Sequence, residues 1–332
     1  SLAAKGNIVY TGDGTHGVTT NDFSTLVNTA ETPVTTSELN TITTEDANVN
    51  IQYTGAVLTS LNDVKRINAV FAKNNAGSNT GQITAAINTT AENLAQLDSN
   101  MVGNQKALDI EITTAIGNDA FKTLNDKTSV TLAFSGAGKM EGSLSSFIKD
   151  DGSNDRAEGI DAAITQAPTV EINITGSTIT SSNNGFTQLN NIASGTDGAI
   201  TASVSGTGEA LAANSLNNLS TNDVITFTVD SHNTNTEENL TIIAGRTTGG
   251  ASNKIDVAKI KDDFADVDTI LSNAKFDHSN AQIVIDALDG SGLFTVANYL
   301  KIKDTHSVNA SSIDFSAVTL SGSYSDLNGL AD

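Results

Sequence analysis

In the stretch Thr169-Val-Glu-Ile-Asn-Ile-Thr-Gly176, apolar and polar residues alternate and a glycine closes the run. Strict alternation with β-branched residues is typical of a half-buried strand. The closing glycine allows the backbone to turn sharply away from the strand. The pattern recurs at 48–55, 129–136 and 199–206, and in shorter form at 7–12 and 317–322.

A second motif, Leu-Asn-x-Leu or a close variant, follows these strand segments. Its copies lie at 39–42, 61–64, 189–192, 216–219 and 327–330, with a shorter version at 124–125. Apolar residues three apart, flanked by polar ones, predict one or two helical turns with one buried side. Successive strands near Ile172, Ile200 and Ile225 are about 25–30 residues apart, which is the spacing expected of solenoid repeats.

These two motifs together predict the fold class. A strand, a crossover with a short helix and a second strand form a right-handed parallel unit. We therefore expect a β-rich α/β repeat protein, a parallel-sheet solenoid of strand–turn–short helix units with a few longer helices inserted. Tandem β-sandwich domains are the alternative, and they would need turn signals every 8–12 residues or so. The observed spacing is longer and favours the solenoid.

Longer helices are expected to interrupt the repeat. Ser60 with Asp63 is expected to start one helix, and Asn253 with Asp256 another. A capping box over 89–92 precedes a third, shorter helical segment. The expected inner faces are Leu61, Val64, Ile67 and Phe71 in the first helix, and Ile260, Phe264, Val267 and Leu271 in the second.

The chain is expected to have three regions. Residues 1–136 form an N-terminal repeat region with inserted helices, and residues 169–332 form a C-terminal repeat region with an inserted helix near 254–275. Between them, 137–168 is rich in glycine and aspartate and contains Pro168, so it is expected to be a loop or a boundary.

Composition excludes several classes of function. Seventeen basic against 38 acidic residues give a net charge of −21, which repels phosphate and argues against nucleic-acid binding. The chain contains no cysteine, so it has no disulfide and no cysteine-ligated metal. No apolar run approaches the roughly 18 residues of a membrane span. Small polar side chains and an acidic surface are typical of secreted bacterial proteins, so we expect an extracellular protein of the bacterial cell surface.

Catalytic motifs are not found in the sequence. The four histidines stand alone, and each is expected to be a hydrogen-bonded surface side chain. The hydrolase motif G-x-S-x-G and the phosphate-binding motif G-x-x-x-x-G-K-[ST] do not occur. Gly12-Asp-Gly14-Thr-His-Gly17 matches G-x-G-x-x-G, but the residues after it are a poor helix start, and a dinucleotide site needs a helix there. We therefore expect that the protein is not an enzyme.

Two acidic loops are the candidate metal sites. One groups carboxylates around Gly152, and the other places them beside the turn at 290–292. The candidate ligands are Asp150, Asp151 and Asp155 in the first loop, and Asp286 and Asp289 in the second. Carboxylates and backbone carbonyls are the oxygen ligands that Ca²⁺ requires. Neither loop matches D-x-[DN]-x-[DN]-G, so solvated loops are the other interpretation, and calcium is the one candidate cofactor.

Strand segments that end in Thr-Gly or Ser-Gly, joined by Leu-Asn-x-Leu turns, resemble the degenerate tandem repeats of large bacterial extracellular proteins. Such arrays are found in surface-layer and giant cell-surface proteins, notably of cyanobacteria and other aquatic bacteria. The residues that carry the resemblance are 200–206 leading to 216–219, and 320–327. The resemblance implies an extracellular, structural and often Ca²⁺-dependent role.

Three functions are compatible with these observations. The first is a subunit or segment of a surface layer, sheath or filament that self-associates through its repeat ends, with divalent cations; the last motif, at 327–330, stops where other copies lead into a strand. The alternative is an adhesin or phage-fibre type binding module that recognises a glycan or receptor through 137–168. The third is a polysaccharide-active enzyme, for which no carboxylate pair stands out and aromatic residues are few.

Overall fold

The computed structural model describes residues 17–20, 50–53, 55–74, 83–98, 106–128, 130–247, 254–286, 293–323 and 326. These residues fall into two units. The first comprises the described residues up to Gly142 together with Ala157–Glu171, and the second comprises Ser143–Arg156 and the described residues from Ile172 onward.

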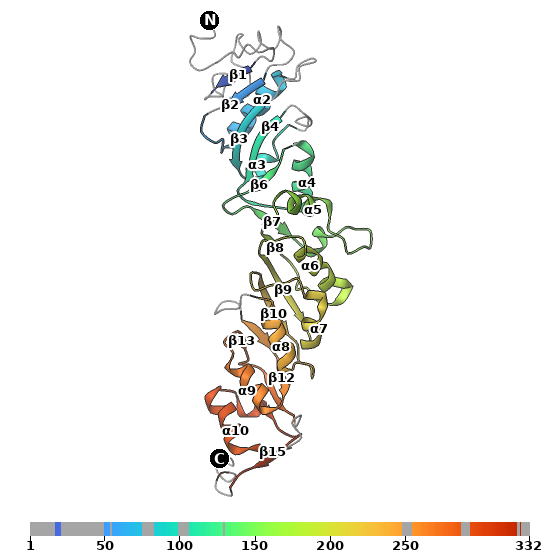
Figure 1. Cartoon of the computed structure of the whole chain (residues 1–332), viewed down its shortest axis with the longest axis vertical. Helices are drawn as coiled ribbons and strands as arrows, with labels where there is room; N and C mark the ends of the chain where they lie inside the picture. Colours follow the sequence, from blue (N-terminus) through green and yellow to red (C-terminus); the bar gives the residue numbers. More distant parts are fainter. Residues whose placement is uncertain are drawn as a thin grey trace. The chain divides into compact units, whose positions relative to one another are not determined.

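In the first unit, strands of one sheet alternate with helices along the chain (Figure 1). The five-stranded sheet has the order β1 (Gly17–Thr20), β2 (Asn50–Tyr53), β3 (Ile83–Thr89), β4 (Lys106–Ile112) and β6 (Leu132–Phe134). Strand β5 (Ala115–Ile116) pairs with β7 (Lys139–Gly142). The helices are α2 (Leu61–Asn74), α3 (Ala91–Leu94), α4 (Asn118–Lys127) and α5 (Glu158–Gln166).

In the second unit, five strands lie side by side in the order β8 (Ile172–Ile174), β9 (Ile200–Gly206), β10 (Val224–Val229), β11 (Ile255–Val257) and β13 (Phe276–Asp277). Two smaller sheets are β12 (Lys259–Asp262), β14 (Gln282–Ile285) and β16 (Ile313–Asp314), and β15 (Leu293–Thr295) with β17 (Thr319–Ser321). The α-helices are α6 (Gly185–Ala193), α7 (Gly208–Ala212), α8 (Glu237–Ala244), α9 (Phe264–Ser272) and α10 (Val296–Leu300).

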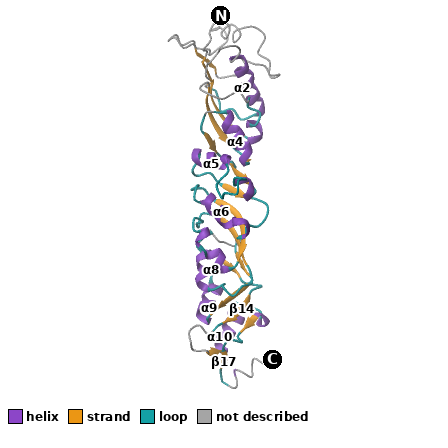
Figure 2. Ribbon diagram, turned by 90° about the vertical axis from the view of Figure 1, so that its right-hand side faces the viewer, coloured by secondary structure: helices purple, strands orange, loops and turns teal. Residues whose placement is uncertain are grey.

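Short helical turns complete the second unit. They are the 3₁₀ turns η3 (Leu144–Phe147), η4 (Ser182–Asn184), η5 (Asn214–Leu216) and η7 (Ala310–Ser312), and the π-helical turn η6 (Lys301–Thr305). Helices α6, α8 and α9 lie on the same side of this unit (Figure 2). Helix α8 packs against both α7 and α9, so neighbouring helices cover neighbouring strands.

The paired strands described above run parallel, which confirms the prediction of an α/β protein built on parallel sheets. Within the described residues these sheets are open and do not close into a barrel. Hairpin-built sandwiches have antiparallel strands, so this pairing argues against the tandem β-sandwich alternative.

Paired residues in neighbouring strands are separated by similar lengths of chain. Ile172 pairs with Ile200, Thr201 with Val224 and Thr228 with Asp256, at offsets of 28 (200 − 172), 23 (224 − 201) and 28 (256 − 228) residues. In the first unit, Ile83 pairs with Lys106 and Ile110 with Leu132, at offsets of 23 (106 − 83) and 22 (132 − 110). Each strand is therefore followed by a crossover of similar size before the next parallel strand.

The alternating runs of the sequence form strands wherever the structure describes them. Runs 48–55, 129–136, 169–176, 199–206 and 317–322 contain β2, β6, β8, β9 and β17, respectively. The run at 7–12 lies outside the described residues. Gly136 and Gly176 have φ of 60° and 96°, so these two glycines provide the left-handed backbone that the turn after the strand requires.

Alternate strand residues and the apolar residues of the Leu-Asn-x-Leu motif form the core. Val204 on β9 and Phe227 on β10 are fully buried, as are Leu189 and Leu216 from two copies of the motif. Burial of a large apolar side chain contributes about 1.5–3 kcal/mol relative to leaving it exposed. The motif leucines therefore stabilise the packing of helical turns on the sheet.

Two predicted helix starts need correction. The helix expected from Asn253 or Asp256 begins only at Phe264, where the Asp263 carboxylate accepts a hydrogen bond from Asp266 N at 3.0 Å. Ile260 belongs to β12, because 255–262 alternates as two short strands. The cap expected at Thr89 is one residue later: Thr90 accepts from Asn93 N, and Thr89 belongs to β3.

The helix expected after Ser60 is confirmed. Asp63 Oδ2 accepts from Ser60 N at 3.0 Å, and Ser60 Oγ accepts from Asp63 N at 3.2 Å, which is the reciprocal capping box. Leu61 does not belong to the inner face, because it is 38% exposed at the first position of the helix. Val64, Ile67 and Phe71 are buried as expected.

The stretch 137–168 is not one continuous loop. It contains β7, η3 and α5, and its longest segment outside these elements is 148–157. The expected division of the chain into two repeat regions around this stretch stays a prediction.

Candidate functional site

Basic side chains satisfy carbonyl groups at or just after the carboxyl ends of three helices. Each basic residue lies later in the chain than the helix whose carbonyl groups it binds. The bonds run from Lys127 Nζ to the carbonyls of Ala95 (2.9 Å) and Leu97 (3.0 Å), from Arg246 to those of Leu211 and Ala212 (3.0 Å for the latter), and from Lys275 Nζ to that of Ala244 (2.6 Å). A cation at this end complements the helix dipole and satisfies carbonyls that lack an intrahelical partner.

Polar side chains satisfy N–H groups at the amino ends of four helices. The bonds run from Ala91 N to Thr114 Oγ1 (3.0 Å), from Ile160 N to Asn118 Oδ1 (2.9 Å), from Gly208 N to Asn235 Oδ1 (2.8 Å) and from Glu237 N to Asp262 Oδ2 (2.7 Å). Asn118, Asn235 and Asp262 are buried. We call these bonds, together with those at the carboxyl ends, the helix-end bonds.

Asn118 and Asn235 each lie directly against a glycine of the helix whose N–H group they bind. A Cβ added at Gly208 would lie 2.9 Å from Asn235 Cα, and a Cβ added at Gly159 would lie 2.7 Å from Asn118 Oδ1. A side chain at either glycine would force the neighbouring segments apart. The close approach of glycine and asparagine is therefore part of how the segments pack.

The asparagine of the Leu-Asn-x-Leu motif also joins successive copies. Asn190 Oδ1 accepts from Asn218 N at 2.8 Å, and Asn190 Nδ2 donates to Asn217 Oδ1 at 3.3 Å. The two copies, 189–192 and 216–219, are one strand–helix segment apart. The motif thus combines a buried leucine with an asparagine that bonds to the next copy, a role that the apolar spacing alone did not reveal.

The first acidic loop does not gather its carboxylates. Asp150 and Asp151 are exposed, and Asp151 Oδ1 accepts from Ser153 N at 2.8 Å. The hydrogen bonds from Ser153 lower the pKa of Asp151. The Asp155 carboxylate lies 4.0 Å from Lys149 Nζ. The Asp151 carboxylate therefore stabilises the local turn, and the Asp155 carboxylate faces a basic side chain.

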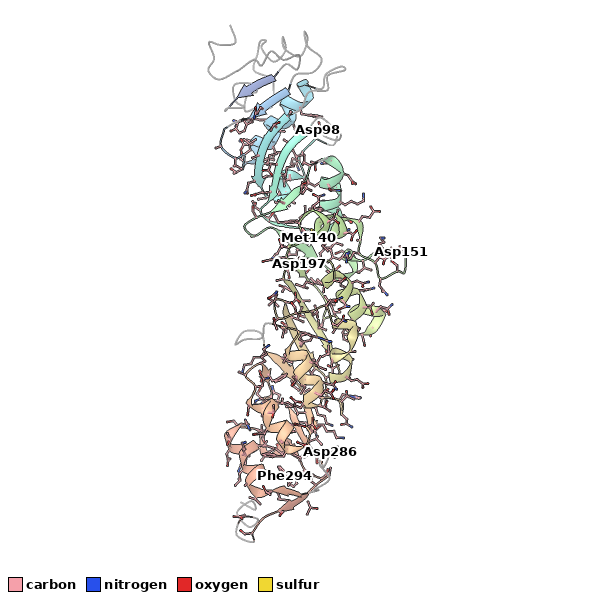
Figure 3. All side chains as sticks on the ribbon, in the orientation of Figure 1. Asp98, Met140, Asp151, Asp197, Asp286 and Phe294 are labelled. Carbon is pink, nitrogen blue, oxygen red and sulfur yellow. The ribbon has the colours of Figure 1, made fainter. Side chains whose placement is uncertain are left out.

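In the second acidic loop, Asp286 Oδ2 lies 2.9 Å from Lys261 Nζ, and Asp289 lies outside the described residues. Asp151 and Asp286 are far apart in the second unit (Figure 3), so the two loops do not form one site. Among the residues that the structure describes, no three histidine, aspartate or glutamate side chains are grouped to hold a metal ion. Calcium binding stays a prediction.

One histidine belongs to a cluster that the sequence did not indicate. His306 Nε2 lies 2.8 Å from Asp268 Oδ1, Lys301 Nζ lies 2.6 Å from Asp268 Oδ2, and the His306 side chain is only 9% exposed. Burial alone would raise the pKa of Asp268, but the hydrogen bonds from Lys301 and His306 outweigh it and lower that pKa. Asp268 and His306 are 38 residues apart, so no sequence motif connects them.

His278 differs from the expected surface histidine as well. It is partly buried, and its Nε2 lies 3.2 Å from the carbonyl of Leu271. Burial lowers the pKa of His278. His232 is exposed, as expected, and His16 lies outside the described residues.

The irregular segment 148–157, which lies within the predicted loop or boundary 137–168, packs on α6. Arg156 Nη1 donates to the carbonyl of Asn191 at 2.7 Å, and Asn191 Nδ2 donates to that of Asn154 at 2.8 Å. Gln188 Nε2 donates to Asn154 Oδ1 at 3.3 Å. Ile148 and Arg156 also pair as an antiparallel bridge, so the base of the loop is closed on itself and tied to the helix.

Two pockets open beside this loop. The larger, about 650 Å³, lies between the loop, η4 and Gln188, and the smaller, about 340 Å³, lies between η3, residues 175–180 and the start of α6. Ser145, Asn183 and Gln188 line both pockets. Their volumes fall within the range of small-molecule sites, roughly 300–1,000 Å³. This pair of pockets is the candidate binding site of the described residues.

Comparisons of the chain with protein-family models, with curated proteins and with solved structures find no match. None of the described helices is long and apolar enough to cross a membrane.

Proposed function

We propose that the chain is a structural protein of the bacterial cell surface, a subunit or segment of a surface layer, sheath or filament that self-associates. The observation that carries this proposal is the set of helix-end bonds. They join consecutive strand–helix segments at both helix ends, in addition to the parallel strand pairing.

The first step is the architecture. Parallel strands at offsets of about 20–35 residues, many of them followed by a helix, support a solenoid in which every repeat is stabilised by its neighbours. In such a stack stability grows with each added repeat, and no repeat buries its own apolar face. Long structural arrays are built in this way.

The second argument for self-association concerns the terminal strand of a solenoid. In an open solenoid the terminal strand keeps unpaired N–H and C=O groups, which can pair with another chain. Because the strands run parallel and the helix-end bonds reach from one segment to the next, a second copy would extend the same pattern. We therefore propose assembly through the repeat ends rather than through a separate interface.

The third step is the charge. A chain with a net charge of −21 repels its copies, and close packing requires counter-ions. Divalent cations bind carboxylates and carbonyl oxygens. We propose that Ca²⁺ supports assembly at the acidic loops. An extracellular location, where calcium is at millimolar levels, fits this dependence. No catalytic role is proposed.

Static light scattering of the purified chain tests the proposal. We expect scattering to rise on addition of millimolar Ca²⁺ and to return to the starting level with EDTA. Magnesium at the same concentration is the matched control for ionic strength. A scattering mass that stays that of a single chain under all conditions would contradict the proposal.

A further inference from the structure

The pocket pair beside the 148–157 loop suggests a ligand site in addition to the proposed assembly. Six of the residues that line the larger pocket carry a side-chain amide or hydroxyl: Ser145, Ser153, Asn154, Asn183, Asn184 and Gln188. Neither pocket is lined by an aromatic residue. Small-molecule sites are usually mostly apolar, so a lining of this kind matches a polar ligand.

Two adjacent residues in this lining have unusual backbone conformations. Asn183 and Asn184 have φ of 52° and 61°, in the left-handed region that glycine adopts without cost. Such strain persists where the surrounding structure requires it, and it is concentrated at functional sites. Glycine would relieve the strain, yet both positions carry an amide that faces the larger pocket.

Both asparagines are exposed, and among the described residues neither side-chain amide has a hydrogen-bonding partner. Neither the Asn183 nor the Asn184 side chain forms a hydrogen bond to another described residue, and Asn184 precedes α6 without capping it. An asparagine before a helix normally accepts from an N–H of the first turn. Here both amides stay free to bind a ligand. Each amide presents a donor and an acceptor, as a sugar hydroxyl does.

The charge of the residues that line the two pockets indicates which class of ligand they can bind. Lys149 and Asp150 are the only charged residues that line either pocket, and their charges cancel. Neither pocket is lined by a cluster of basic groups, so the lining offers little to an anion. A neutral ligand with several hydroxyl groups fits these donors and acceptors best.

We propose that the pocket pair binds a neutral glycan, with the amides of Asn183 and Asn184 as direct hydrogen-bonding groups and Gln188 between the two pockets. Because no aromatic ring lines the pockets for stacking on the sugar, binding depends on hydrogen bonds, each of which contributes only modestly to affinity in water. Millimolar dissociation constants follow from a few such bonds.

Saturation-transfer NMR with free sugars tests the site. The probes are mannose, galactose, N-acetylglucosamine and cellotriose, with galacturonic acid as the charged comparison. The key variant is the double substitution Asn183→Gly and Asn184→Gly, which removes both amides and keeps the left-handed backbone accessible. Asn222→Gly, at an exposed asparagine outside the pockets, is the matched control.

We expect at least one neutral sugar to bind the wild-type chain and the Asn222→Gly variant equally. In the double variant we expect about a tenfold loss of affinity, with an unchanged or raised melting temperature. Three results would overturn the proposal: no signal from any neutral sugar, equal binding by the double variant, or binding of galacturonic acid alone. A Gln188→Ala variant that binds as tightly as wild type would remove Gln188 from the site.

Discussion

The amide of Asn235, which is fully buried, accepts a hydrogen bond from the backbone N–H of Gly208 at 2.8 Å. Its Nδ2 donates to the carbonyls of Asp230 at 2.6 Å and Lys259 at 2.9 Å. One side chain thus joins the start of α7, the end of β10 and the start of β12. The segments are joined by polar contacts as well as by apolar packing.

Replacement of Asn235 by alanine removes all three bonds and leaves three backbone groups without their partner. We expect a loss of about 3–5 kcal/mol in the free energy of unfolding. Urea denaturation monitored by circular dichroism measures it. Asn222→Ala, at an exposed asparagine, is the control and should change stability by about 0.5 kcal/mol or less. Equal effects of both variants would contradict a special role for Asn235.

Gly208→Ala tests the close approach of the same two segments. A Cβ at this position meets the carbonyl oxygen of Thr234 at 2.8 Å and Asn235 Cα at 2.9 Å, both of them backbone atoms. We expect a loss of about 1–3 kcal/mol from overpacking. Gly245→Ala, where the nearest atom is 3.3 Å away, is the matched control and should be nearly neutral. Thermal melts of both variants measure the difference in stability.

Arg246→Met removes the basic group at the end of α7 and keeps much of the apolar side chain. The carbonyls of Leu211 and Ala212 then lose a charged donor in a buried position, at a cost of about 1.5–3 kcal/mol. We expect amide hydrogen exchange to accelerate in 208–212 more than in 264–272. Uniform acceleration in both helices would show that the arginine acts on the whole unit and not on this helix end.

His278 predicts a pH dependence of stability. Burial lowers its pKa, so the unfolded chain binds more protons between the lowered value and the ordinary one, about 6.5. Stability is therefore complete above about pH 6.5 and decreases as the pH falls below it. His278→Gln should flatten this part of the curve, whereas His232→Gln, at an exposed position, should not. Urea melts from pH 7 to 5 measure the difference.

The strands were predictable because their pattern is local. The alternation around Ile172 and Ile200 specifies one buried and one exposed face, and the structure has strands in both places. The helix near Phe264 was placed too early because Ile260 fits a helical spacing as well as an alternating one. In the structure Ile260 lies in the strand β12, and Asp263 caps the helix α9 that follows it.

The contacts between segments could not be predicted from the sequence. Asn235 and Gly208 are 27 residues apart, and each resembles an ordinary loop residue when read alone. The polar pockets combine 145–154 with η4 and α6, which only the fold brings together. Acidic residues occur in solvated turns and in metal sites equally, so the metal-binding role of the five candidate calcium ligands stays a prediction.

Electron microscopy of the purified chain in millimolar Ca²⁺ tests the central claim, self-assembly through repeat ends, most directly. We expect ordered sheets or filaments that disappear in EDTA. Their diffraction should show a spacing of about 4.7–4.9 Å along the direction in which strands stack, because strands would continue from one molecule to the next. Single, monodisperse particles with and without Ca²⁺ would contradict the claim.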